Sequence, residues 1–160
     1  MQSDVAGVTQ DDVVDSVLAA SRALVAVAAR SLAGAEAEVT LPQYRALVLL
    51  AARGPQRSLD LAEALDVNQS TATRMCDRLE RKKLIERERP DDNRRTVIVT
   101  ISAGGAALVA AITRRRREEL RRILRKMTSE DRAALVPALR AFADAAGEAP
   151  DQAWSLGWGT

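Results

Sequence analysis

Residues 68–81 constrain the fold most, because their apolar and polar side chains follow the period of a helix. Four apolar residues recur at positions i, i+3, i+4 and i+7: Ala72, Met75, Cys76 and Leu79. A helix places these four on one face, and Asn68 just before them is typical of an N-cap. The first turn and the other face are polar and largely basic: Gln69, Ser70, Thr71, Thr73, Arg74, Asp77, Arg78 and Arg81. The pattern therefore predicts a helix that is buried on one side and presents short polar side chains and arginines on the other.

A shorter helix is predicted immediately before this one, over residues 58–65, with Ser58 as its cap. Its inward residues are apolar and its outward residues acidic: Leu61, Ala62 and Leu65 inward, Asp60 and Glu63 outward. An acidic face is repelled by phosphates, so this helix is predicted to support its neighbour rather than to read a nucleic acid. A two-residue turn separates the two helices, and together they form a helix-turn-helix.

Two strands with a turn between them are predicted to follow, over residues 84–89 and 96–101. The second strand is rich in β-branched residues, and the intervening residues 90–95 have a turn composition. Asp92 lies two residues before Arg94, so its carboxylate could hold the guanidinium extended at the tip of the hairpin. An arginine held in this way suits the narrow, electronegative minor groove of DNA. The hairpin therefore has the character of a wing.

In these features the chain resembles the MarR family of bacterial winged-helix transcription regulators. The resemblance extends over residues 13–145, and its most specific part is the Asp92-x-Arg94 motif of the wing. It implies a homodimer that binds a pseudo-palindromic operator in double-stranded DNA, usually as a repressor that a small-molecule effector releases. Asp66 and Lys83 occupy two positions where the family commonly has glycine. A left-handed lysine costs on the order of 1 kcal/mol relative to glycine, so the helix end near Lys83 is expected to differ locally.

Helices are also predicted on both sides of this unit. Residues 1–11 are expected to be disordered or loosely docked, and residues 13–32 to form a long helix with a wide apolar stripe. The stripe could pack within its own subunit or against a partner, and the resemblance favours the partner. Residues 40–43 have the form of a capping box with proline in the first turn, and the helix that they open is apolar nearly all round as far as residue 52.

Beyond the wing, Ser102 is predicted to cap a helix that runs to Met127. The arginine run in its middle, within residues 114–122, could be a second nucleic-acid patch or a solvated face. Pairs spaced i,i+4, such as Arg114 with Glu118 and Arg115 with Glu119, favour the solvated face. A last helix is predicted from Thr128, with Leu135, Leu139 and Phe142 on one face and a bend at Pro137. Gly104-Gly105, a faint echo of a phosphate loop, is better explained by flexibility at a helix start.

The fold class predicted from these elements is mainly α (α+β): a winged helix-turn-helix unit with a two-stranded wing, plus an all-helical dimerisation unit. The expected division of the chain is an N-terminal arm and dimerisation helix, a DNA-binding domain, a connecting helix with a C-terminal dimerisation helix, and a tail: residues 1–39, 40–101, 102–146 and 147–160. No regular structure is predicted for the tail, which holds Trp154 and Trp158.

The composition of the chain excludes several classes of protein. The 160 residues are 47% hydrophobic and 29% charged, enough for one compact domain with a core. No apolar run reaches membrane-spanning length and the first residues lack a basic signal-peptide start, so a cytoplasmic protein is expected. One cysteine and no histidine exclude an intrachain disulfide and a Cys/His zinc site, and no metal or cofactor is predicted. Residues 68–95 carry nine Lys/Arg against six Asp/Glu, a net of +3 in a chain whose total is +2, so positive charge is concentrated there.

The predicted function is therefore sequence-specific binding of double-stranded DNA. Five residues are expected to read bases in the major groove: Gln69, Ser70, Thr71, Thr73 and Arg74. Arg78 and Arg95 are expected to contact phosphates, and Arg94, oriented by Asp92, to enter the minor groove.

The sequence leaves three alternatives to this function. The winged unit could serve protein contacts without specific DNA binding, or the chain could sense oxidants through Cys76. The place of Cys76 on the inward apolar face favours an inert core thiol instead. An enzyme is not expected, because without histidine no convergent acid–base set is visible.

Overall fold

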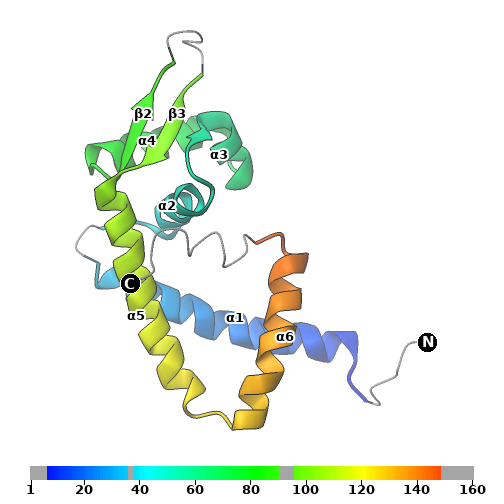
Figure 1. Ribbon diagram of the computed structural model, residues 1–160. Coiled ribbons are helices and arrows are strands. Elements are labelled where there is room, and N and C mark those ends of the chain that lie inside the picture. The colour runs from blue at the N-terminus through cyan, green and yellow to red at the C-terminus, as the bar shows by residue number, and fades with distance from the viewer. Residues whose placement is uncertain (1–6, 36–37, 91–95, 149–160) are drawn as a thin grey trace.

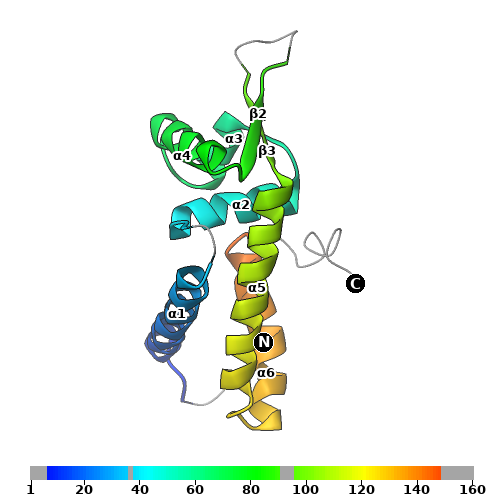
Figure 2. The same ribbon diagram turned by 90° about the vertical axis from the view of Figure 1, so that its left-hand side faces the viewer.

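The computed structural model describes residues 7–35, 38–90 and 96–148, which form six helices and three short strands. In chain order these are α1 (Gln10–Ala33), α2 (Leu41–Arg53), β1 (Gln56–Arg57), α3 (Ser58–Ala64), α4 (Gln69–Arg81), β2 (Ile85–Glu88), β3 (Ile98–Ile101), α5 (Ala103–Leu124) and α6 (Ser129–Ala145). Figure 1 shows α2, α3, α4 and the strands gathered at one end of the molecule, from which α5 leads away towards α6. Turning the view by 90° shows β2 and β3 beside α4, above the start of α5 (Figure 2). The predicted mainly helical fold with a winged helix-turn-helix is confirmed.

The sheet contains one strand more than the predicted two-stranded wing. Strand order is β1-β3-β2, and both pairings are antiparallel. In the hairpin Arg87 pairs with Val99, while β1 adds Gln56 opposite Val99 and Arg57 opposite Ile98. A two-residue strand carries no periodic signal, so only its neighbours in space could reveal it.

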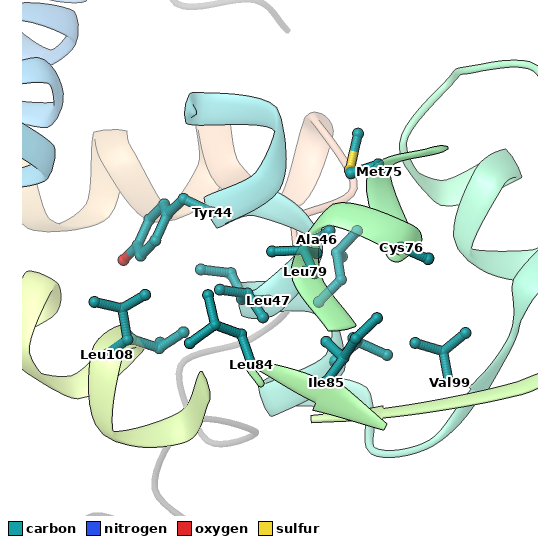
Figure 3. Close-up of a cluster of buried hydrophobic side chains, with 14 of the residues drawn as sticks. Tyr44, Ala46, Leu47, Met75, Cys76, Leu79, Leu84, Ile85, Val99 and Leu108 are labelled. Atoms are coloured by element: carbon teal, nitrogen blue, oxygen red, sulfur yellow. The ribbon is translucent and has the colours of Figure 1, made fainter. Parts of the chain in front are cut away.

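The core lies between α2, α4, the hairpin and the start of α5, as Figure 3 shows. Its largest fully buried side chains include Leu47, Leu50, Leu61, Leu79, Ile85, Val99 and Ile112. Helix α2 is central because it is buried on almost every side, as its apolar sequence predicted. Its capping box also forms: Thr40 Oγ1 accepts from the Gln43 amide at 3.4 Å, and Gln43 Oε1 accepts from the Thr40 amide at 3.0 Å.

The predicted starts of two helices are wrong. Helix α1 begins at Gln10 rather than Val13, because Thr9 and Asp12 form a reciprocal capping box, so residues 10 and 11 belong to the helix. At α3 the cap residue is Arg57, and Ser58 is the first helical residue. Arg57 makes no capping bond; its guanidinium instead pairs with the Asp60 carboxylate at 2.7 Å, which lowers the pKa of that carboxyl through the hydrogen bond.

Three helix ends share one backbone geometry, in which a residue with positive φ follows the last turn: Asp66 (φ 53°), Lys83 (φ 58°) and Gly147 (φ 68°). At each, two amides turn back to carbonyls of the last turn, the hydrogen-bond pattern of a Schellman motif. The local difference expected at Lys83 is therefore wrong: the lysine adopts the left-handed conformation that glycine usually supplies.

Gly105 has a different role from the flexibility predicted for it. A Cβ at this position would lie 2.1 Å from the carbonyl oxygen of Leu84 and 2.9 Å from Ile101 Cγ1. The side chain of Ser102 caps α5 by accepting from the Gly105 amide at 3.0 Å, and its hydroxyl donates to the Lys83 carbonyl at 2.7 Å. Helix α5 thus starts directly against the end of α4 and the hairpin, and only glycine fits there.

The predicted solvated face of the arginine run of α5 is present in part: Arg114, Arg117, Arg121 and Arg122 are exposed, whereas Arg115 and Arg116 are half-buried. The helix ends at Leu124, and within the described residues neither Arg114 nor Arg115 pairs with the glutamate four residues on. Glu119 instead accepts from Arg30 of α1 at 2.7 Å, and Arg116 lies over the Tyr44 ring of α2 with 5.2 Å from Cζ to the ring centroid. Part of the run therefore ties α5 to α1 and α2, because long arginine stems can pack while their charge meets a carboxylate or a ring.

Helix α6 begins after the Thr128 cap, as predicted, and remains helical past Pro137. None of its residues is buried. In the described parts of the chain, no helix combines the length and apolar character needed to cross a membrane. The tail with Trp154 and Trp158 lies outside the described residues.

Candidate nucleic-acid interface

Helix α4 is divided into the two faces that its sequence predicted. Its inward face consists of the four buried residues Ala72, Met75, Cys76 and Leu79, between 0% and 9% exposed. Its outward side chains are exposed at six positions: Gln69, Ser70, Thr73, Arg74, Arg78 and Arg81. Asp77 and Thr71 are half-buried. A polar and basic helix face therefore lies open to solvent. Figure 2 shows that α4 lies beside the hairpin.

The first turn of α4 is fixed by Asn68. Its Oδ1 atom accepts from the Thr71 amide and from the Ser70 hydroxyl, both at 2.8 Å. The Thr73 hydroxyl donates to the Gln69 carbonyl at 2.9 Å. These bonds use the hydroxyl protons of Ser70 and Thr73 locally, which leaves their oxygen lone pairs and the Gln69 amide group facing solvent.

The arginines of α4 extend from this turn. An Nη2 atom of Arg74 donates to Thr71 Oγ1 at 3.5 Å, a long contact that leaves the rest of the guanidinium open. Arg81 donates through Nε to the Asp77 carbonyl at 3.3 Å. None of Arg74, Arg78 and Arg81 forms an ion pair with another described residue. Their charge is therefore available to an anion from outside the chain.

A hollow of about 470 Å³ separates the start of α2 from the second half of α4. The residues around it include Glu38, Thr40, Gln43, Arg78, Arg81 and Lys82. Three of these side chains are basic and the amino end of α2 is adjacent, where the helix dipole favours negative charge. The hollow extends the basic surface of α4 towards α2, a feature that the sequence did not reveal because the two elements are separated along the chain.

Arg87 of β2 joins the hairpin to α4. Its Nη1 atom lies 2.8 Å from Asp77 Oδ1, and its Nε donates to Glu80 Oε2 at 3.0 Å with Nη2 on the same oxygen. The hydrogen bond with Glu80 raises the pKa of Arg87 further above its usual range. No local pattern predicted this contact, although the sequence holds one signal of it: Arg87 lies two residues after the buried Ile85, so both share one face of the strand.

The residues predicted to contact DNA from the tip of the wing are not among those that the structure describes. Asp92, Arg94 and Arg95 lie outside the described residues, so their orientation towards a groove or a phosphate stays a prediction.

Cys76 has the environment of a core thiol. Its side chain is 1% exposed, and burial raises the pKa of the thiol, an effect that outweighs the nearby Arg87 charge. A buried thiol with a raised pKa is a poor nucleophile, since the thiolate is the reactive form. The environment favours the inert core thiol over the redox sensor.

Exposed apolar side chains also occur away from α4, on α1 and on α6. Large apolar side chains of α1, together with Val8 just before it, are 38–63% exposed: Val8, Val13, Val14, Val17, Leu18, Leu24 and Val25. Those of α6 are 50–57% exposed: Val136, Leu139 and Phe142. A helix such as α6 with no buried residue gains little from its own fold, because isolated helices are marginal in water. Exposed apolar area of this extent marks an interaction surface.

The arrangement of α3 and α4, the hairpin and the exposed basic helix face defines a winged helix-turn-helix protein. The sequence model of the MarR family matches residues 39–97. The crystal structure of RV1404 from Mycobacterium tuberculosis is 40% identical and superimposes with a TM-score of 0.81, covering 91% of this chain and 99% of that one. The chain belongs to the MarR family of transcription regulators.

Two further solved structures share the fold. YusO from Bacillus subtilis is 27% identical with a TM-score of 0.67, over 83% of this chain and 94% of that one. A MarR family protein from Bacillus stearothermophilus is 21% identical with a TM-score of 0.75, over 89% of this chain and 100% of that one, a likeness of fold alone. No curated protein matches the chain.

Proposed function

We propose that this chain is a homodimeric regulator that binds a specific sequence of double-stranded DNA, with α4 in the major groove. The observation that carries the proposal is the division of α4: one face completes the core, and the other presents short polar side chains followed by three arginines without ion-pair partners among the described residues. Short side chains allow close approach to base edges, while arginines one and two turns on reach bases and phosphates.

The roles of the individual residues follow from their positions on α4. Gln69, Ser70, Thr71, Thr73 and Arg74 belong to the first two turns and read base edges, with Arg74 the residue of greatest reach. Arg78 contacts a phosphate beside the hollow at the start of α2, where the helix dipole adds to its charge.

At the tip of the wing, Arg94 enters the minor groove, Asp92 orients it and Arg95 contacts the backbone. These three assignments rest on the sequence motif and on membership of the family.

The partner proposed for the apolar surface of α1 and α6 is a second copy of the chain. Two copies place two α4 helices on one side of a duplex, where successive major grooves are about 34–36 Å apart, and the operator is then pseudo-palindromic. Covering the exposed side chains of α6 supplies the burial that this helix lacks within its own subunit.

Replacing Phe142, which is 57% exposed, with glutamate should convert the dimer to a monomer and remove operator binding. Sedimentation equilibrium measures the change. A wild-type chain that is monomeric at working concentration would contradict the dimer.

Release by an effector is proposed at the junction of α1, α2 and α5. Among the residues that the structure describes, Arg115 Nη1 and two nitrogens of Arg116 are buried there with no hydrogen-bond partner. Arg115 Nη1 lies 3.2 Å from where a Cβ of Gly34 would be, and Arg116 lies over the Tyr44 ring. Unpaired buried donors are costly, so an anionic ligand that satisfies them would stabilise one spacing of the two subunits over another. An anion that releases DNA should also raise the melting temperature of the wild type. It should not raise the melting temperature of Arg116→Met.

The DNA-binding proposal is tested by selecting duplexes from a genomic library and measuring affinity for the enriched sequence against salt. Binding should weaken with a log–log slope of about −0.9 for each phosphate that the dimer neutralises. Arg74→Ala should lose affinity and specificity, with an unchanged melting temperature because the side chain is exposed. Arg121→Ala, at an exposed arginine of α5, is the matched control because it removes the same charge away from α4. Failure to retain any duplex at low salt would refute DNA binding and favour a winged module for protein contacts.

A further inference from the structure

The contact between Arg87 and α4 bridges the two elements that meet DNA in the proposed function. One guanidinium engages two carboxylates from the same helix: Asp77 through Nη1 at 2.8 Å, and Glu80 through Nε at 3.0 Å and Nη2. The two acidic residues are three positions apart on α4 and therefore lie on one side of that helix. A planar guanidinium bound at two edges fixes an orientation, which a single flexible ammonium cannot do.

The position of Arg87 along β2 determines what the contact controls. Ile85 is 2% exposed and anchors the base of the strand in the core, while Glu86 and Glu88 point to the other, exposed face. Arg87 is the next residue after Ile85 on the face directed at α4, farther out along the hairpin. The angle of the hairpin to α4 is therefore set on β2 by an apolar contact at its base and by an ionic contact farther out.

We propose that Arg87 is a positioning residue for DNA binding, which fixes the hairpin of β2 and β3 to α4 through Asp77 and Glu80 so that both elements fit one duplex together. The inference rests on the proposed function, because it assigns Arg87 no contact with DNA of its own. Its side chain is 25% exposed and its guanidinium is already engaged by two carboxylates, so it is poorly placed to neutralise a phosphate.

Two elements in a fixed relative orientation bind as one unit, and loosening that orientation makes the second contact less probable after the first. Linked contacts of this kind can raise affinity by roughly 10²–10⁴ over either contact alone. Losing part of this gain should weaken specific binding by about tenfold when Arg87 is replaced. An electrostatic role alone makes a different prediction: Asp77 and Glu80 repel phosphates, so removing their charge would tighten binding.

The experiment uses the full-length protein and the duplex that the wild type enriches from a genomic library. Affinity for this duplex and for a scrambled one is measured across salt concentrations for Arg87→Met, Arg87→Lys and the double variant Asp77→Asn/Glu80→Gln. Glu86→Gln, on the opposite face of the same strand, is the matched control. Melting temperatures establish that each variant is folded, and should Arg87→Met fail to fold, the lysine variant and the double variant carry the test.

Positioning predicts that both Arg87 variants and the double variant bind the enriched duplex about tenfold more weakly, with a shallower salt dependence, while the control keeps wild-type affinity. The double variant is decisive because it keeps Arg87 and removes two negative charges. Tighter binding by the double variant, or wild-type affinity in Arg87→Lys, would overturn the inference while leaving the proposed function intact. A wild type that enriches no duplex would refute the proposed function itself, and the inference with it.

Discussion

Replacing Lys83 with glycine should stabilise the protein, although the substitution removes a whole side chain. Lys83 has φ 58° at the end of α4, and its amide donates to the Glu80 carbonyl at 2.8 Å. A left-handed conformation costs an L-residue roughly 1–2 kcal/mol, because Cβ approaches the following carbonyl oxygen. Glycine escapes this cost but loses about 0.4–1 kcal/mol through its greater freedom in the unfolded chain. The expected net gain is about 1 kcal/mol.

For a domain of this size, 1 kcal/mol corresponds to a rise in melting temperature of about 2–4 °C. Thermal denaturation followed by circular dichroism, together with urea denaturation, measures it. Lys83→Ala is the control for charge, since alanine removes the ammonium but keeps Cβ, and no gain is expected from it. Asp66→Gly is the control for context: Asp66 has φ 53° and the same hydrogen-bond pattern, but aspartate tolerates this conformation better, so the gain should be smaller.

Two results would refute a backbone cost at Lys83: a lower melting temperature in Lys83→Gly, or a rise no larger than that of Lys83→Ala. The first result would mean that the lysine side chain contributes more than its backbone conformation costs. The second would mean that the gain comes from removing a charge beside Lys82 and Arg81. DNA affinity is measured in parallel, because Lys83 is exposed and lies next to the proposed interface.

Three further outcomes follow from the same structure. Gly105→Ala should destabilise the protein by about 1–3 kcal/mol in urea denaturation, because its Cβ would lie 2.1 Å from the Leu84 carbonyl oxygen. Gly104→Ala should cost much less, because its Cβ would lie 3.3 Å from the Lys83 carbonyl oxygen. Equal effects of the two substitutions would contradict the close packing of Gly105. Native Cys76 should react with a thiol reagent only as fast as the protein unfolds, since its side chain is 1% exposed; rapid labelling would revive the redox sensor. The hydrogen bond from Arg57 lowers the pKa of the Asp60 carboxyl in the folded protein. The charged carboxylate therefore stabilises the fold at pH values above its unfolded pKa, near 3.8, and this contribution is lost as the pH falls through the lower folded pKa. Asp60→Asn should therefore flatten the acid side of a plot of melting temperature against pH, and an unchanged plot would show that the pair contributes nothing.

The sequence by itself determined the elements whose signals are local. The apolar period of residues 72–79 predicted which face of α4 is buried, and Asn68, Thr40 and Ser102 predicted three caps that the structure contains. These predictions hold because a helix face and a cap each depend on residues within a turn or two of one another. The resemblance to the MarR family came from residues 58–101, which include both helices and the hairpin.

Other features were decided only by tertiary structure, because they depend on residues far apart along the chain. Three contacts join elements that no local pattern connects: the pairing of β1 with β3, the ion pairs of Arg87 with α4, and the stacking of Arg116 on Tyr44. The arginine run of α5 shows the same limit, since Glu119 binds Arg30 of α1 in preference to the arginine one turn before it.

At Lys83 the local preference of the residue and the tertiary structure favour different backbone conformations. Propensity alone argues against a left-handed lysine, yet the turn must bring Leu84 back to the carbonyl of Leu79 so that the hairpin can begin in the core. A local cost of about 1 kcal/mol is accepted because the long-range contacts that depend on this turn, among them the burial of Leu84 and Ile85, are worth more.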